Sequence, residues 1–374
     1  MKKNGRKGEN TSDKLKETTK FATWNVRGKI SDPIWRQKLG EDLKSSKIAV
    51  CCLQETKWQE DADVSLPGGG RIINIAARSS NENKIHYGMG LYLSETWDRR
   101  FMGLEYVSDR ISVSKFRILK DIKRPLIIIN VYGPCHGKTL ERDMAAVEGF
   151  YEELKRTVEK WKLKAAMVLV SGDFNSRIGQ RKEEDSKIMG VYTKGPRNIH
   201  GQYLADFLHE TNLFLSNTAF KHKDHHIATW HGANVVRDAE GNEIRRKGIH
   251  NQIDYIAILQ RHKGMITNAR SFQGVKYETD HSRVVMEIRL KAIYPVSQRK
   301  VVKKQKRDLS ALHRKDKVRE RYVTLIDRNI EKYRNERAAE EFLNGPTKIA
   351  ENQRAIGKIL SEAIESSVPK TPKK

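Results

Sequence analysis

The chain has 374 residues, of which 37% are hydrophobic and 32% charged, enough apolar material to bury one large core or two modest ones. It contains no apolar run of about 18 residues, and its first 20 residues are charged throughout, so we expect no membrane span or secretory signal and a nuclear, or nuclear and cytoplasmic, location. Its 72 Lys and Arg residues outnumber 47 Asp and Glu residues, and the resulting net charge of +25 favours a polyanionic partner such as nucleic acid.

The first third of the chain alternates between strand-like and helix-like patterns. Residues 21–26 predict a short strand, and Ser31-Asp32-Pro33 predicts the start of a helix because proline is favoured in a first turn. Residues 48–53 are a continuous apolar run that ends at Gln54-Glu55, which is typical of a strand buried on both faces. Further strands are predicted at residues 71–77, 86–93, 111–119 and 126–132.

The middle of the chain continues this alternation. Residues 139–162 carry apolar side chains at a spacing near 3.6 and predict the clearest helix, and residues 201–211 predict another. Strands are predicted at residues 167–170, 253–259 and 283–290. The mixture predicts an α/β fold in which two sheets pack face to face and helices cover them. We assign residues 21–290 to this domain and residues 1–20 to a basic, disordered tail.

The composition changes after Leu290. Residues 298–307 are rich in Lys and Arg, as in a solvated linker, a nuclear import signal or a nucleic-acid patch. Apolar stripes at helical spacing follow at residues 318–333 and 349–364. We therefore assign residues 291–374 to a basic linker and amphipathic helices, which could dock on the core, pair with each other or contact a further domain.

Five short motifs occur in a fixed order along the predicted domain. They are WNVRG at residues 24–28, LQETK at 53–57, GDFN at 172–175, QIDY at 252–255 and TDHS at 279–282. Each motif is weak alone. Together they supply a metal carboxylate, an Asp/Asn pair that can position water, a His, and a carboxylate to orient that His, which metal-dependent phosphodiester hydrolysis requires.

These motifs resemble those of the endonuclease/exonuclease/phosphatase superfamily. Within it, the chain is similar to the apurinic-type endonucleases of LINE-like (non-LTR, RTE-type) retrotransposons and to their host-domesticated descendants, such as the craniofacial development protein 2-like sequences. The resemblance implies a four-layer α/β sandwich of the DNase-I-like kind, here with a helical C-terminal extension. In retrotransposon polyproteins a helical connector joins the endonuclease to a reverse transcriptase, so a reverse transcriptase domain is a possible partner in a parent polyprotein.

The chemistry of the motifs suggests a role for each polar residue. Glu55 is the first predicted ligand of Mg²⁺ or Mn²⁺, because these hard cations prefer carboxylate oxygens. Asp173 would orient or deprotonate the attacking water, and Asn175, two residues on, would donate to the phosphate. His281 would meet the scissile phosphate, and Asp254, expected to be exposed at a strand start, would fix its tautomer.

Three further site residues are weaker predictions. The resemblance implies that Asn25 organises hydrogen bonds around Asp173 or the metal, and that Tyr132 donates to the phosphate. Asp280 is predicted to add a second metal contact. Asn25 and Tyr132 could equally have purely structural roles, since both residue types are common at strand ends.

The motifs depart from those of cellular abasic-site repair enzymes. Arg27 stands where the repair enzymes carry a carboxylate, and Gln252 stands where they carry Arg. The last motif opens with Thr279 instead of Ser. These departures argue against efficient abasic-site repair, and Arg27 and Gln252 are associated with the retroelement branch.

A basic hairpin is predicted between the third and fourth motifs, at residues 235–247 with its tip at 239–242. The resembling retroelement endonucleases carry a hairpin here that probes a DNA groove, whereas the alternative is a plain surface hairpin. Trp230, just before it, could stack on a base or deoxyribose or could pack in the core. The predicted nucleic-acid contacts are Arg27, Trp230, Arg245, Arg246 and Lys247.

The cysteines and remaining histidines lack a motif. The three cysteines cannot form a disulfide framework and have no zinc-like spacing, so we predict a reducing compartment and small packing roles for Cys51, Cys52 and Cys135. A histidine cluster flanked by lysines is predicted to be solvent-exposed and not to bind metal; it comprises His222, His225 and His226.

The sequence thus predicts a Mg²⁺- or Mn²⁺-dependent DNA endonuclease that nicks one strand and leaves 3′-hydroxyl and 5′-phosphate ends, of retrotransposon or domesticated retrotransposon origin. The alternatives are an abasic-site repair enzyme or another phosphoesterase of the superfamily. A third class is a nucleic-acid or chromatin-binding protein that retains the fold with little catalysis. The complete set of predicted catalytic carboxylates and His281 favours an active enzyme.

Overall fold

The computed structural model describes residues 18–76, 88–118, 124–135, 140–237, 243–272, 279–290 and 316–338, together with 359–360, 363 and 366–367. The chain divides into two compact units between Tyr294 and Pro295. The first unit contains every motif described above.

A seven-stranded sheet has the order β14-β15-β1-β2-β5-β4-β3. The pair β1 and β2 is parallel, and the other neighbours are antiparallel. Strand β2 is buried along its whole length, as its continuous apolar run predicts. The strands are β1 (Thr18–Asn25), β2 (Ile48–Gln54), β3 (Ala62–Ser65), β4 (Arg71–Ile75), β5 (Met89–Leu93), β14 (Ile266–Phe272) and β15 (Arg283–Arg289).

A six-stranded sheet has the order β10-β13-β9-β8-β7-β6. Here the pair β8 and β9 is parallel, and the other neighbours are antiparallel. Gly172 in β9 is required by close packing, because a Cβ atom there would lie 1.9 Å from the carbonyl oxygen of Val131. The strands are β6 (Phe101–Ser108), β7 (Ile111–Phe116), β8 (Leu126–Tyr132), β9 (Met167–Asp173), β10 (Leu213–Leu215) and β13 (Asp254–Leu259).

In the described part of the first unit, four α-helices accompany the two sheets. The start of α1 is where the sequence predicts it, with Pro33 in its first turn and the Asp32 carboxylate accepting a 2.7 Å hydrogen bond from the amide of Ile34. The helices are α1 (Pro33–Ser45), α2 (Glu95–Asp98), α3 (Leu140–Lys162) and α4 (Ile199–Thr211), and the short 3₁₀ helices are η2 (Glu184–Lys187), η3 (Ser216–Thr218), η4 (Asp224–His226) and η5 (Gln260–Met265).

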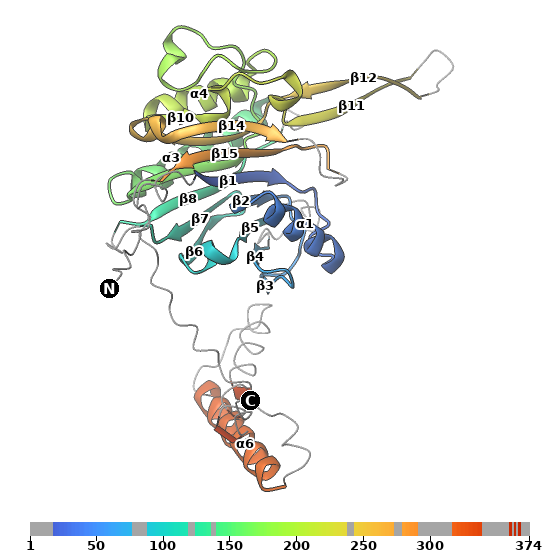
Figure 1. The fold of residues 1–374 in the computed structure, drawn as a ribbon, viewed down its shortest axis with the longest axis vertical. Helices are drawn as coiled ribbons and strands as arrows, with labels where there is room; N and C mark the ends of the chain where they lie inside the picture. The colour runs from blue at the N-terminus through green and yellow to red at the C-terminus, as the bar shows by residue number, and fades with distance from the viewer. Residues whose placement is uncertain are drawn as a thin grey trace, which may run out of the picture. The chain divides into compact units, whose positions relative to one another are not determined.

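Three apolar clusters define the order of the layers (Figure 1). Leu39 and Leu43 of α1 pack with Cys51 on the outer face of the seven-stranded sheet. Cys52 points to the opposite face, into a cluster that both sheets line, because neighbouring strand side chains alternate. Residues of α3 and α4 cover the outer face of the six-stranded sheet. This helix, sheet, sheet, helix order confirms the predicted four-layer α/β sandwich.

Several elements differ from their predictions. Strands β3, β6, β10 and β14 were not predicted. In β14, buried and half-buried residues alternate from Asn268 onwards, but a register shift between Ile266 and Asn268 interrupts the alternation at its start. The predicted strand at residues 86–93 begins at Met89, and residues 86–87 lie outside the described part of the chain.

The predicted hairpin is a two-stranded antiparallel sheet of β11 (Trp230–Arg237) and β12 (Glu243–Asn251), which extends away from the two main sheets (Figure 1). Its predicted tip, residues 239–242, lies outside the described residues, as do the side chains of Arg245, Arg246 and Lys247. In the second unit, α6 (Asp316–Ala338) confirms the first predicted helical stripe, whereas most of the second stripe falls outside the described residues. Over the part of the chain that is described, no helix is long and apolar enough to cross a membrane.

Candidate active site

Strand register brings four of the five motifs to the same edge of the two sheets. In the seven-stranded sheet, Asn25 at the end of β1 is paired with Gln54 at the end of β2, and Glu55 follows. In the six-stranded sheet, Asp173 at the end of β9 is paired with Tyr132 on one side and Asp254 on the other. The parallel pairs therefore present their carboxyl ends, where ligands commonly bind in α/β sheets, to a shared site.

Asn25 joins the two halves of this site. Its side chain is fully buried, and its amide nitrogen donates to Glu55 Oε1 at 2.9 Å and to Asp173 Oδ2 at 3.0 Å. The Tyr132 hydroxyl also donates to Glu55 Oε1, at 2.9 Å. Lys57 Nζ lies 3.4 Å from the other oxygen, Glu55 Oε2. Two carboxylates from different motifs are thus held side by side by neutral and cationic donors.

Backbone strain marks the two residues that follow the central strands. Glu55 and Asn175 both have φ of 49°, a left-handed conformation that side-chain-bearing residues seldom adopt. The amide of Asn175 donates to Asp173 Oδ1 at 2.9 Å, and its side chain donates to the Gly133 carbonyl at 2.9 Å. Strained residues of this kind concentrate at functional sites, where the surrounding structure holds them in place.

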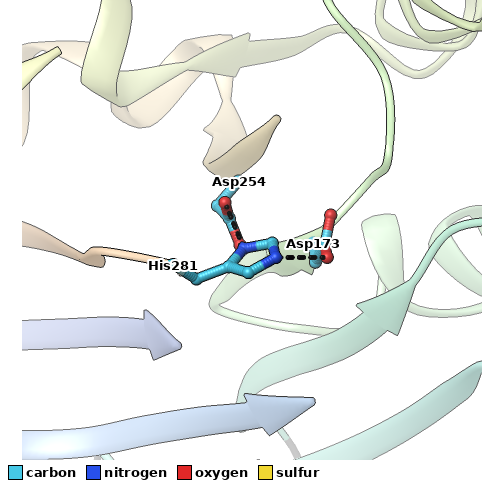
Figure 2. Close-up of side chains that lie close together, drawn as sticks. All are labelled: Asp173, Asp254 and His281. Carbon is cyan, nitrogen blue, oxygen red and sulfur yellow. Dashed lines mark hydrogen bonds and ion pairs between the residues drawn. The ribbon is translucent and has the colours of Figure 1, made fainter. Parts of the chain in front are cut away.

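His281 lies between two carboxylates (Figure 2). Its Nδ1 lies 3.1 Å from Asp254 Oδ2, within hydrogen-bond distance, and its Nε2 lies 3.9 Å from Asp173 Oδ2. The expectation that Asp254 is exposed was wrong, because this side chain is 0% exposed. Pairing of β13 with β9 places it beside Asp173, and the segment around Thr229 closes over it, since the Thr229 hydroxyl accepts from the Asp254 amide at 3.0 Å.

Burial and charge shift the protonation of this group. Burial, and then the neighbouring Asp254 carboxylate, raise the pKa of Asp173 to about 7. Burial would lower the pKa of His281, but Asp254 and Asp173 outweigh it and raise this pKa to about 9. His281 is therefore a cation near neutral pH, paired with Asp254, and Asp173 has the pKa expected of a general base.

Asp280 is held by two residues predicted to contact nucleic acid. Arg27 Nη1 lies 2.7 Å from Asp280 Oδ2, and Trp230 Nε1 donates to the same oxygen at 3.0 Å. The indole of Trp230 is half-buried and leaves no room for a side chain at position 232, where a Cβ atom on Gly232 would come within 2.2 Å of the ring. Asp280 Oδ1 has no hydrogen-bond partner among the described residues.

Sequence reasoning missed two residues at this site. Cys135 was predicted to be a packing residue, but it is exposed, and its Sγ lies 3.4 Å from the Tyr132 hydroxyl and 3.3 Å from Asn175 Nδ2. Lys57 belongs to the second motif and pairs with Glu55 without having been given a role. Position gave a signal in both cases, since each follows a central strand by only three residues. Cys51 and Cys52 are buried and free, as predicted.

The donor groups at this edge fit a divalent cation. Single donor atoms of Asp173, Asp254 and His281 lie within 4.8 Å of one another, so this group could hold a metal ion. The hydrogen bond between His281 and Asp254 already uses two of these ligand atoms, however. Glu55 offers Oε2, and Asp280 offers Oδ1, which has no hydrogen-bond partner among the described residues and lies 3.9 Å from His281 Nε2. Carboxylate oxygens are the ligands that Mg²⁺ and Mn²⁺ prefer.

A model of the endonuclease/exonuclease/phosphatase family matches residues 22–266, which is more than half of the chain and includes four of the five motifs. The chain belongs to this family. It is a family of metal-dependent phosphoesterases, in agreement with the buried cluster of acidic and histidine side chains.

Individual proteins give more distant likenesses. The chain is 24% identical over 325 residues to craniofacial development protein 2 of Bos taurus; the match covers 84% of this chain and 47% of that protein, so the chain spans about half the length of the relative. The AP endonuclease LMAP from Leishmania major superposes with a TM-score of 0.51 at 16% identity, covering 75% of this chain and 91% of that chain. The catalytic domain of Xenopus laevis APE2 gives 0.52 at 18%, covering 74% and 95%. The endonuclease domain of TRAS1, a telomere-specific non-LTR retrotransposon, gives 0.47 at 16%, covering 73% and 100%.

Proposed function

We propose that this protein is a divalent-metal-dependent endonuclease that nicks one strand of duplex DNA and leaves 3′-hydroxyl and 5′-phosphate ends. One observation carries the proposal. Glu55 and Asp173, bridged by Asn25, lie at the same edge of the sheets as His281 with its partner Asp254. The net charge of +25 favours a polyanionic substrate over a small phosphorylated one.

Each residue has a task that its contacts support. Glu55 and Asp280 would hold the cation, which when bound neutralises negative charge on the phosphate oxygens. Asp173 accepts the proton of the attacking water as the bond between phosphorus and the 3′ oxygen breaks. His281, kept in one orientation by Asp254, donates to a phosphate oxygen. Tyr132 and Asn175 would have to exchange their present acceptors, Glu55 and the Gly133 carbonyl, to donate to the phosphate as well.

We further propose that the chain derives from a non-LTR retrotransposon endonuclease and acts in the nucleus. Arg27 supports this origin, because it stands where repair enzymes have a carboxylate and here neutralises Asp280. A retroelement endonuclease with Arg27 and an abasic-site repair enzyme with a carboxylate at this position thus differ in the charge of the site. A 3′-hydroxyl released by nicking would serve to prime reverse transcription.

Plasmid nicking tests the function. Purified protein is incubated with supercoiled DNA and Mg²⁺, Mn²⁺ or EDTA, and the 3′ ends are probed by extension with a DNA polymerase. We expect metal-dependent open-circular DNA with extendable ends, and a loss of at least about a hundredfold in rate for Glu55→Gln and Asp173→Asn. Glu105→Gln is the matched control, since this carboxylate pairs with Lys115 and Lys160 on the outer surface.

The outcomes separate the classes of function. Nicking by Glu55→Gln and Asp173→Asn at the rate of the control would refute the assigned site. Metal-independent DNA binding without nicking by the wild-type protein would favour a nucleic-acid-binding protein that retains the fold. Selective cleavage at abasic sites, with none on intact plasmid, would favour a repair enzyme.

A further inference from the structure

A pocket lined by basic side chains lies outside the candidate active site. An open pocket of about 570 Å³ is lined by side chains from two segments, the loop leading into η4 and the edge strand β14. All of the described lining residues are basic or carry imidazole: Lys221, His222, Lys223, His225, His226 and Arg270. The prediction that the histidines are solvent-exposed was correct for His225 alone, since His222 and His226 are half-buried in the pocket wall.

The acidic residue nearest in sequence forms its ion pair outside this pocket. Asp224 lies between Lys223 and His225 in sequence, but its carboxylate pairs with Lys194 at 2.8 Å, and this contact lowers the pKa of Asp224. No ion pair of Lys221, Lys223 or Arg270 is found within the described residues. Three permanent positive charges therefore face the same open space.

The walls of the pocket are fixed by hydrogen bonds and stacking. His226 Nδ1 donates to the Ser271 carbonyl at 3.2 Å, and His222 Nε2 bonds the Asn268 side chain at 2.9 Å. The Arg270 guanidinium lies over the Phe272 ring, 4.2 Å from its centroid. These contacts hold Arg270 and the two imidazoles in place before any ligand binds, which lowers the cost of binding.

The histidines do not form a metal site in this arrangement. Among the described residues, the ligand atoms of Asp173, Asp254 and His281 are the one set of three that lies within 4.8 Å of one another. A metal site built from imidazoles also gains nothing from neighbouring lysine and arginine cations, which repel it. The pocket is suited to an anion with several oxygen acceptors, such as phosphate.

The pocket is connected to the active site by short stretches of backbone. Helix η4 ends four residues before Trp230, whose indole donates to Asp280. Ser271, which accepts from His226, pairs with Val284 of β15, three residues after His281. The pocket and the active site are therefore only a few residues apart along both stretches of backbone.

We propose that this pocket binds backbone phosphates of duplex DNA outside the nick, as a second anchoring site for the substrate. The inference rests on the proposed function for its choice of partner, but its test does not require cleavage. Each phosphate neutralised by a fixed cation releases counterions, so the pocket should contribute to the salt dependence of binding and should fix position without reading sequence.

Binding of the full-length chain to a short DNA duplex is measured in EDTA at several salt concentrations. The variant K221Q/K223Q/R270Q removes the three charges, and K155Q/R156Q/K164Q removes two lysines and an arginine from α3 and the turn after it. We expect the slope of log affinity against log salt to become shallower by about 2.7 for the pocket variant, at 0.9 per phosphate. The ratio of the wild-type affinity to the affinity of the pocket variant should then fall about 40-fold as the salt concentration rises from about 50 to about 200 mM. The control should keep the wild-type slope.

A second variant guards against misfolding. K221Q/K223Q changes only exposed side chains and should lower the slope by about 1.8. A wild-type slope for both pocket variants, or an equal change in the α3 control, would overturn the proposal, as would an effect seen with an RNA duplex but not with DNA. Plasmid nicking is scored separately: a protein that does not nick but shows the pocket effect refutes the proposed function and supports the pocket.

Discussion

Asn25→Ala removes the residue that joins the two halves of the site. The wild-type amide donates two hydrogen bonds to carboxylates, at 2.9 Å to the half-buried Glu55 and at 3.0 Å to the buried Asp173. Hydrogen bonds to charged groups contribute about 1.5–3 kcal/mol each, so the two together set an upper range of about 3–6 kcal/mol. Because Glu55 keeps its bond from Tyr132, we expect the free energy of unfolding to fall by about 3 kcal/mol.

The same substitution should impair chemistry beyond its effect on stability. The amide of Asn25 lowers the pKa of Asp173, so its loss raises that pKa further and leaves less of the carboxylate able to accept a proton. Glu55 and Asp173 also lose their fixed spacing. We expect nicking to fall by about two orders of magnitude, equivalent to about 2.7 kcal/mol in the transition state.

The assay pairs urea denaturation with single-turnover plasmid nicking. Asn74→Ala is a matched control, because Asn74 is 2% exposed and its amide also donates two hydrogen bonds, to the carbonyls of Trp58 and Glu60. This control should lose stability and keep its nicking rate under conditions where it is folded. An Asn25→Ala protein that is folded and nicks as fast as the control would refute the reasoning.

Three further predictions test the periphery of the site. Arg27→Ala frees Asp280 Oδ2 from its ion pair, so the Mg²⁺ concentration that half-saturates nicking should fall; an unchanged Mg²⁺ titration would contradict the assignment of Asp280 to the metal. Replacing hairpin residues 239–242 by a Gly-Ser turn should redistribute nick positions on one plasmid while total nicking is largely kept. If sequencing finds the same nick positions for the variant and the wild-type protein, the hairpin is a plain surface hairpin with no role in choosing the site. A chain ending near Lys291 should still nick at low salt but bind DNA with a shallower salt dependence, and a well-folded, inactive truncation would contradict this.

The sequence predicts the site well where a motif directly follows a buried strand. Glu55 and Asp173 each come at the end of an apolar run, so their place at a sheet edge follows from the strand pattern. The two residues come together because the two sheets pack against each other, which brings positions more than a hundred residues apart into contact. That contact came from the family resemblance and not from any local pattern.

Burial of polar side chains was the least predictable property. Asp254 begins a strand and follows polar residues, so its local sequence favours exposure, yet its side chain is enclosed by β9 and by the segment around Thr229. His226 is likewise half-buried by a segment distant in sequence, because one wall of its pocket comes from β14, an unpredicted strand about 45 residues further along the chain. Local periodicity carries no information about such partners.

The halves of the site come from different sheets. Asn25, Glu55 and His281 belong to strands of the seven-stranded sheet or to the residues beside them, whereas their partners lie in the six-stranded sheet. The hydrogen bonds from Asn25 to Asp173, from Tyr132 to Glu55 and from His281 to Asp254 all cross between the sheets. The geometry needed for catalysis therefore depends on how one sheet is positioned over the other.

Apolar packing alone does not fix that position, because the hydrophobic effect has no direction. A buried polar network beneath the site supplies one. Gln54 donates to Asn130 across the two sheets at 2.7 Å, and Asn130 donates back to the Leu53 carbonyl at 3.1 Å. Sliding one sheet over the other would leave these groups unpaired in the core, at about 1–3 kcal/mol for each. Since Gln54 immediately precedes Glu55, the interaction that sets the register of the sheets also positions the residue that we propose as the first metal ligand.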